Sequence, residues 1–192
     1  MRRIVCLGDS LTSGHGIGAA AAYPALLHQK VRRAGLPFEV VNAGVARATS
    51  ADAHARLERA LEGDVRVLVL ALGVNDGLRG VPVAQLKANL GRIIEAAQAR
   101  GIAVLLCAME ALPLHGWAYT TAFHNAYGEL ADRYTLTIVP FILMNVIGNA
   151  RLMQADRAHP NAEGARAIAD TIWPYLERML TGAVLASPRG QS

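Results

Sequence analysis

Residues 4–11, Ile4-Val5-Cys6-Leu7-Gly8-Asp9-Ser10-Leu11, decide the fold prediction, because an apolar run ends there in a short polar turn. An apolar run without polar alternation is typical of a strand covered by helices on both faces of a parallel sheet. Gly8, Asp9 and Ser10 are also ordinary residues of strand-to-helix turns. Their position nevertheless places a serine hydroxyl where the first strand should stop, and open α/β sheets bind ligands at that edge.

The rest of the chain repeats this alternation of apolar runs and helical patterns. Strands are predicted at 4–7, 38–41, 65–72 and 102–107, with a weaker fifth at 136–139. Helical spacing of apolar residues predicts helices over roughly 23–34, 50–61, 86–97, 123–133 and 165–176. Pro174 should kink the last helix or restart it. Alternating strands and helices predict a three-layer α/β/α fold with a central five-stranded parallel sheet.

Length and composition predict one compact domain. The chain has 192 residues, of which 53% are hydrophobic, and this is enough for a sizeable core. We expect a single domain over 1–181 and a flexible C-terminal tail over 182–192, which ends Ser-Pro-Arg-Gly-Gln-Ser. No charged-then-apolar leader precedes Ile4, and no apolar stretch approaches about 18 residues. A cytoplasmic protein without a membrane span is expected, or a periplasmic or secreted one if a leader has been removed.

Charge and cysteine usage narrow the possible partners. The net charge of +4 comes from basic and acidic residues spread along the chain, so nucleic acid is not an expected partner. Cys6 and Cys107 each lie in a predicted buried strand, and two isolated cysteines lack the spacing of a zinc site. We interpret them as core thiols.

Polar clusters follow the predicted strands or open the last helix. They are Ser10, residues 42–50, residues 73–76 and residues 156–161. Because the carboxyl ends of parallel strands meet at one edge, these clusters should converge there.

Ser10, His159 and Asp156 form the candidate for nucleophilic catalysis. A serine hydroxyl needs a base to remove its proton, and imidazole suits this role near neutral pH. Asp156, three residues before His159, can reach the other ring nitrogen, and Pro160 keeps His159 out of helical geometry. The alternative is a helix-entry turn with a solvated histidine. The remaining histidines are expected to be surface or packing residues: His15, His28, His54, His115 and His124.

Acyl transfer also requires hydrogen-bond donors for the oxygen that becomes negative. Asn75 supplies a side-chain amide, and Gly73 allows a sharp turn at the sheet edge. The Ser10 backbone N–H is expected to be a second donor. Asn-Asp-Gly is also an ordinary turn sequence, so a purely structural turn is the alternative.

Taken together, these segments resemble the SGNH hydrolases, also called the GDSL esterase and lipase family, from about Ile4 to Leu180. The family's blocks occur in order: Gly8-Asp9-Ser10-Leu11-Thr12, then Gly73-Val74-Asn75-Asp76, then Asp156 with His159-Pro160-Asn161. The resemblance implies a flavodoxin-like fold and a Ser10, Asp156 and His159 triad that needs no metal and no cofactor.

Two further segments look closest to one branch of that family, the acyl-CoA thioesterase I, lysophospholipase and arylesterase branch. They are Ala22-Tyr23-Pro24-Ala25-Leu26-Leu27 and Asn75-Asp76-Gly77-Leu78-Arg79-Gly80. The resemblance implies a serine hydrolase that cleaves small-molecule acyl or aryl esters or thioesters through an acyl-enzyme.

The second block departs from the family pattern. Where the family has a glycine whose N–H serves the oxyanion, this chain has Arg47, followed by Ala48 in place of an aspartate. Arginine still carries a backbone N–H, but a positive φ would strain it; Gly44 is the nearby fallback donor. The Arg47 guanidinium either points into solvent or overhangs the cleft, where it would attract an anionic substrate group.

Apolar residues after the third and fourth strands are candidates for an acyl groove, or for packing on the domain's own core. They are Leu78, Val81, Met109, Leu112, Pro113 and Trp117. Two alternative functions stay open: a carbohydrate O-deacetylase with the same triad, and a binding module whose oxyanion loop has weakened.

Overall fold

The computed structural model describes residues 1–186, and its centre is one parallel sheet. The strands are β1 (Arg2–Gly8), β2 (Phe38–Gly44), β3 (Val65–Ala71), β4 (Ala103–Cys107) and β5 (Thr137–Val139). Their order is β2-β1-β3-β4-β5, and every neighbouring pair is parallel. This is the flavodoxin-like order, so the predicted fold class is confirmed.

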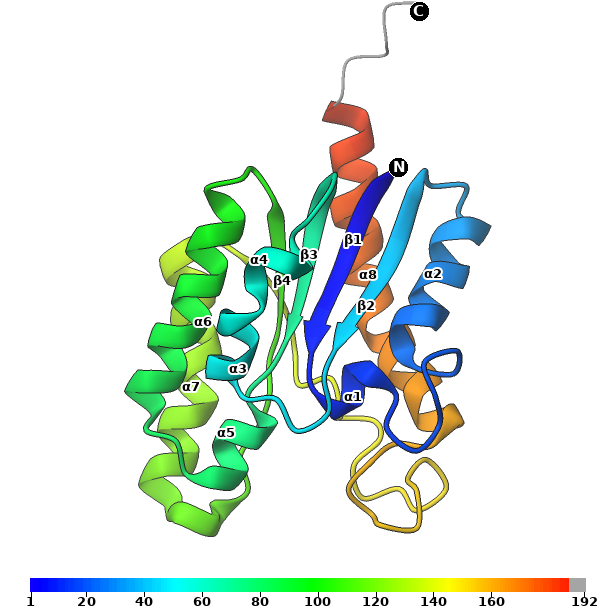
Figure 1. The fold of residues 1–192 in the computed structure, drawn as a ribbon. Coiled ribbons are helices and arrows are strands. Elements are labelled where there is room, and N and C mark those ends of the chain that lie inside the picture. The colour runs from blue at the N-terminus through cyan, green and yellow to red at the C-terminus, as the bar shows by residue number, and fades with distance from the viewer. Residues whose placement is uncertain (187–192) are drawn as a thin grey trace, which may run out of the picture.

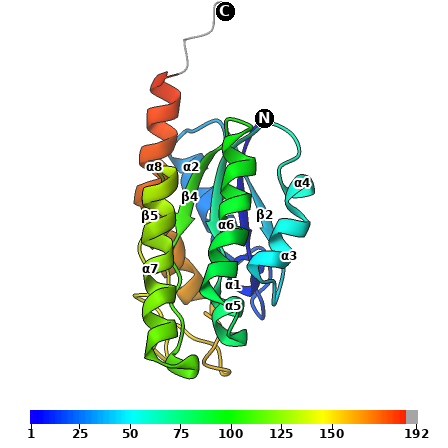
Figure 2. The same cartoon turned by 90° about the vertical axis from the view of Figure 1, so that its left-hand side faces the viewer.

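Helices cover both faces of the sheet (Figure 1). On one face lie α3 (Ser50–Ala55), α4 (Leu57–Ala60), α6 (Val83–Gln98) and α7 (Trp117–Tyr134), and on the other lie α2 (Tyr23–Arg33) and α8 (Ala162–Ala186). Figure 2 shows α6 and α7 side by side, in agreement with their mutual contacts. The short helices α1 (Ser10–Ser13) and α5 (Val74–Arg79) and the 3₁₀ turn η1 (Pro113–His115) follow the carboxyl ends of strands.

Several element boundaries differ from the sequence prediction. The helix predicted over 50–61 is divided at Arg56 into α3 and α4. The predicted tail begins inside α8, which continues through Pro174 to Ala186, and residues 187–192 lie outside the described residues. The helix continues beyond Pro174 because apolar residues continue along its buried face: Leu176 and Leu180 are fully buried.

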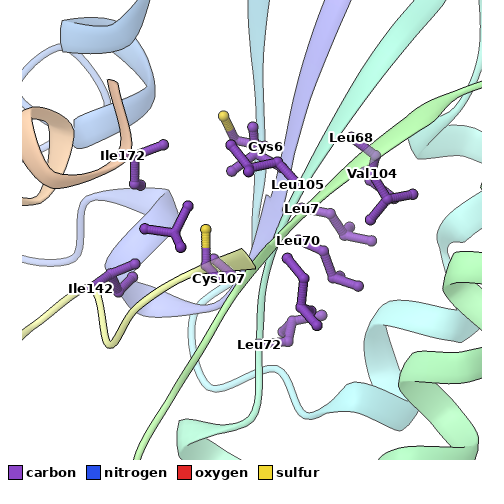
Figure 3. Close-up of a cluster of buried hydrophobic side chains, with 14 of the residues drawn as sticks. Cys6, Leu7, Leu68, Leu70, Leu72, Val104, Leu105, Cys107, Ile142 and Ile172 are labelled. Carbon is purple, nitrogen blue, oxygen red and sulfur yellow. The ribbon is translucent and has the colours of Figure 1, made fainter. Parts of the chain in front are cut away.

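The core lies on both sides of the sheet (Figure 3). Cys6 and Cys107 project toward the side that carries Ile172 of α8, whereas Leu70 and Val104 project toward the opposite side. Both cysteines are free and buried, and burial raises the pKa of each thiol.

No helix within residues 1–186 is both long enough and apolar enough to span a membrane.

Candidate active site

Ser10 begins α1 at the point where β1 ends. Asp9 caps this short helix, because its carboxylate accepts a hydrogen bond from the Leu11 N–H at 2.9 Å. The turn is tight: a Cβ at Gly8 would lie 1.8 Å from Thr12 Oγ1. Glycine at this position therefore allows the chain to reverse immediately after the strand and hold Ser10 at the sheet edge.

His159 lies between Ser10 and Asp156. Asp156 Oδ2 is 2.7 Å from His159 Nδ1, and His159 Nε2 is 3.1 Å from Ser10 Oγ. With its proton on Nδ1, the imidazole donates to the carboxylate and accepts from the serine hydroxyl. Hydrogen bonds from the His159 ring and from the backbone N–H groups of His159 and Ala158 hold the pKa of Asp156 well below its usual range.

Gln154 joins the histidine turn to the loop that follows α1. Its side-chain amide donates to His15 O at 2.7 Å and to Pro160 O at 2.8 Å, and its backbone N–H donates to His159 O at 2.8 Å. The His15 ring lies 4.6 Å from the His159 ring, tilted by 48°. The sequence predicted His15 to be a surface or packing residue, and it is exposed and lies against His159; its contact with the histidine turn and the role of Gln154 were not predicted.

Asn75 lies at the start of α5, directly beyond β3. Its Nδ2 donates to Ala48 O at 2.9 Å, which orients the amide and leaves its second N–H unused within the described residues. Gly73 precedes it with φ +128°, and a Cβ there would lie 1.9 Å from Tyr127 Oη. Tyr127 in turn donates to Leu72 O at 2.7 Å, so the turn that presents Asn75 packs directly on the core.

Arg47 adopts the left-handed conformation, with φ +66°. The loop around it folds against the end of β1: Val45 N–H donates to Gly8 O at 3.1 Å, and Ala48 N–H donates to Val45 O at 3.2 Å. The Arg47 carbonyl accepts a hydrogen bond from Arg79 at 3.0 Å, while its N–H has no hydrogen-bond partner within residues 1–186.

Gly44 is not available as the fallback donor. Its N–H already donates to Asn42 Oδ1 at 2.9 Å, and Asn42 Nδ2 donates to Thr12 O at 2.8 Å. A Cβ at Gly44 would also lie 2.3 Å from Ser13 N. Gly44 therefore permits β2 to approach the α1 backbone, and of the two N–H groups only that of Arg47 lacks a hydrogen-bond partner within residues 1–186.

Two buried carboxylates lie behind the site. Burial raises the pKa of Asp9 to about 6, against the lowering effects of the Leu11 N–H and of the nearby His159. Asp9 Oδ2 has no hydrogen-bond partner among the described residues. Burial also raises the pKa of Asp76, whose carboxylate accepts from Ser50 N at 2.9 Å and from Ser50 Oγ at 2.6 Å.

The predicted acyl-groove residues are only partly brought together. Leu78, Leu112, Pro113 and Trp117 are exposed, and Val81 is half-buried with its carbonyl bonded to Tyr119. Met109 is fully buried in the core, so it does not line an open groove; the chain after β4 turns it inward. The cavity beside Ser10 and His159 has a volume of only about 10 Å³, and its lining includes none of these residues.

Within the described residues, no group of three or more His, Cys, Asp or Glu side chains is arranged to hold a metal ion.

Comparison with known proteins places this geometry among ester hydrolases. The sequence profile of the GDSL-like Lipase/Acylhydrolase family matches residues 6–167. Esterase TesA of Pseudomonas aeruginosa is 36% identical over 92% of this chain and 89% of its own length. Thioesterase 1/protease 1/lysophospholipase L1 of Escherichia coli K12 is 33% identical over 92% of this chain and 84% of its own. The crystal structure of the psychrotrophic esterase EstA from a Pseudoalteromonas species, inhibited by monoethylphosphonate, superposes with a TM-score of 0.88 at 27% identity, covering 93% of this chain and 98% of that one.

Proposed function

This chain belongs to the GDSL-like lipase/acylhydrolase family, and from this premise we propose that it hydrolyses carboxylic esters and thioesters through an acyl-enzyme on Ser10. The observation that carries the proposal is the continuous contact from Asp156 through His159 to Ser10, with distances of 2.7 and 3.1 Å. The Ser10–His159 distance allows the imidazole to take the hydroxyl proton, and the His159–Asp156 distance allows the carboxylate to orient the ring.

In the proposed mechanism, Ser10 Oγ attacks the acyl carbonyl carbon while His159 Nε2 takes the hydroxyl proton. Asp156 stabilises the resulting imidazolium and keeps the ring in position. As the tetrahedral intermediate collapses, His159 gives the proton to the leaving alcohol or thiol. A water molecule, deprotonated by the same imidazole, then attacks the acyl-enzyme and releases the acid.

The negative oxygen is held by donors from three separate turns. The Ser10 N–H and the free N–H of the Asn75 amide are the first two, and the Arg47 N–H is the third. Asn75 is oriented by Ala48 O, and the Arg47 turn is held by Arg79. Donors fixed before the reaction stabilise the developing charge without having to reorganise.

The proposed substrates are small acyl or aryl esters and acyl thioesters. The relatives named above are an esterase and a thioesterase with lysophospholipase activity in its name, which supports both classes of leaving group. For this chain we place the acyl group against the exposed apolar side chains Leu78, Leu112 and Trp117, because each methylene removed from water contributes about 0.8 kcal/mol.

Hydrolysis of a short nitrophenyl ester tests the function. Ser10→Ala should lower kcat/KM by about 10⁴-fold or more, with the far-ultraviolet circular dichroism unchanged. Thr181→Ala is the control: it removes a hydroxyl that donates to Glu177 O within α8, and it should keep its activity. A serine-reactive phosphonate should abolish wild-type turnover.

Absence of turnover in the folded wild-type protein would instead favour the binding module. Turnover that survives Ser10→Ala would refute the assigned nucleophile. A panel of nitrophenyl esters of increasing acyl length, run beside acyl-CoA thioesters, measures chain-length and leaving-group preference.

A further inference from the structure

Exposed apolar side chains gather at one end of the molecule. Apart from Met1, the exposed large apolar side chains of the described residues all follow the carboxyl ends of strands. They are Val45 after β2, Leu78 after β3, Leu112, Leu114 and Trp117 after β4, and Met144 and Ile147 after β5. We call the surface formed by residues 45–49, 74–82, 108–117 and 140–161 the active-site face. Figures 1 and 2 show these segments at the end that also carries α1, opposite the N-terminus.

The apolar side chains extend beyond a groove for one acyl chain. They follow four of the five strands and span the sheet from β2 to β5, a width of about 19 Å at the usual strand spacing. Trp117 is 75% exposed, and none of these side chains lines the small cavity beside Ser10. Apolar groups that point outward around a catalytic opening suit an extended apolar phase better than a single ligand.

The active-site face carries four arginines and three carboxylates. Of these carboxylates, Asp76 is buried and accepts from Ser50, whereas Glu110 and Asp156 each lie 2.7 Å from an imidazole, those of His124 and His159. Its exposed arginines are Arg47, Arg79, Arg151 and Arg157. Exposed arginines in the same segments as outward-facing apolar groups are complementary to an anionic, apolar surface.

We propose that the active-site face docks on an anionic lipid surface and presents Ser10 to acyl esters within it. This inference rests on the proposed ester hydrolysis. The apolar side chains enter the boundary between headgroups and acyl chains, and the arginines contact headgroup phosphates. Ser10 and His159 open on the same face, so docking brings the scissile ester to the nucleophile rather than covering the site.

Trp117 provides a direct readout of docking. The chain has two tryptophans, and the other, Trp173, lies on α8. In a Trp173→Phe variant, vesicles of phosphatidylglycerol should shift the Trp117 emission to the blue, and vesicles of phosphatidylcholine should shift it much less. High salt should weaken the response.

Substitutions away from the acyl-groove candidates separate docking from chemistry. Met144→Ser combined with Ile147→Ser should lower affinity for phosphatidylglycerol vesicles by about tenfold or more, with turnover of a short soluble ester unchanged. Arg151→Gln should lower the affinity for phosphatidylglycerol vesicles by about fivefold. The control Arg33→Gln, at the far end of α2, should leave that affinity unchanged.

Binding that is absent, or that is unaffected by the Met144 and Ile147 substitutions, would overturn the docking proposal. If the apolar face is instead covered by a second copy of the chain, sedimentation will show a dimer that the same substitutions dissociate, and that result also overturns it. Absence of short-ester turnover in the wild-type protein would contradict the proposed hydrolase function and not the docking proposal.

Discussion

Asp9 is the residue whose burial is hardest to account for by folding alone. Its carboxylate is fully buried, one oxygen has no partner among the described residues, and its pKa is raised to about 6. Above that pH the fold therefore contains an incompletely satisfied buried charge. The Asp9 carboxylate and a protonated His159 attract each other. We therefore infer that the buried charge is retained for activity, because it stabilises the imidazolium that forms when Ser10 attacks.

Asp9→Asn should accordingly increase stability and reduce activity. Because the folded-state pKa lies above the unfolded value, wild-type stability falls as the pH rises from about 4 to about 6. The free energy of unfolding of the variant, relative to wild type, should rise by about 2–3 kcal/mol across that interval, and kcat should fall by about tenfold. Urea unfolding at both ends of the interval and ester turnover measure the two effects.

Asp52→Asn is the control, because its effect on stability should change with pH in the opposite direction. Hydrogen bonds from Thr49 lower the pKa of Asp52, so its contribution to stability is present above the unfolded pKa and lost on acidification. That variant should be less stable than wild type at neutral pH, and this difference should shrink as the pH falls. The same pH trend in both variants would contradict the role assigned to burial of Asp9.

Arg47 combines a strained backbone with a charge near the candidate oxyanion site. The left-handed conformation costs a residue with a Cβ about 1 kcal/mol or more. Arg47→Gly and Arg47→Ala both remove the guanidinium, but only glycine removes the strain. Glycine should therefore be the more stable of the two variants by about 1 kcal/mol in urea unfolding.

Both variants should lower kcat/KM for an anionic ester relative to a neutral one, by about fivefold at low salt. The neutral ester should be hydrolysed as before, since the backbone N–H remains. An unchanged ratio between the two substrates would show that the guanidinium points into solvent.

At the scale of elements, the candidate site depends on loops that are joined across the sheet edge. Arg56, at the break between α3 and α4, donates to Ala43 O and Gly8 O, the ends of β2 and β1. Gln154 connects the histidine turn to the loop after α1. The distance between Ser10 and His159 is therefore set by contacts between segments far apart in sequence.

Gln154→Ala should lower kcat by about tenfold with little change in KM for a short ester, because the histidine turn loses its connection to His15 and Pro160. Gln98→Ala is the matched control: its amide donates to Tyr134 O at 3.0 Å, away from the site, and its removal should leave kcat unchanged. Equal kcat values in the two variants would show that Gln154 does not position His159.

At the scale of the whole molecule, one core joins both layers of helices to the sheet. Cys6 on β1 and Cys107 on β4 are fully buried within it, and burial raises the pKa of both thiols. Thiol chemistry needs the thiolate and access to solvent. Both groups should therefore become reactive only when the core opens.

A thiol reagent such as dithionitrobenzoate should react with neither cysteine in the native protein and with both in urea. Under native conditions, slow labelling should proceed at a common rate set by global unfolding. Rapid labelling of one thiol alone would show that part of the core opens independently.

The sequence by itself determined the layered α/β architecture, the family and the candidate catalytic residues. Unalternated apolar runs identify strands buried on both faces, and polar residues at their ends identify one chemical edge; the predicted fold and family are confirmed. The catalytic roles of Ser10, Asp156 and His159 stay predictions, now with the distances that they require.

Only the tertiary structure decided how residues from separate segments meet. It gives Arg47 its positive φ, engages the Gly44 N–H with Asn42, buries Met109 and places His15 against His159. Periodicity reports which face of an element is apolar, but backbone dihedrals in loops and contacts between distant turns depend on how the elements pack. The candidate nucleophile and candidate base could therefore be proposed from sequence, whereas the conformation of the oxyanion loop and the contacts that support His159 could not.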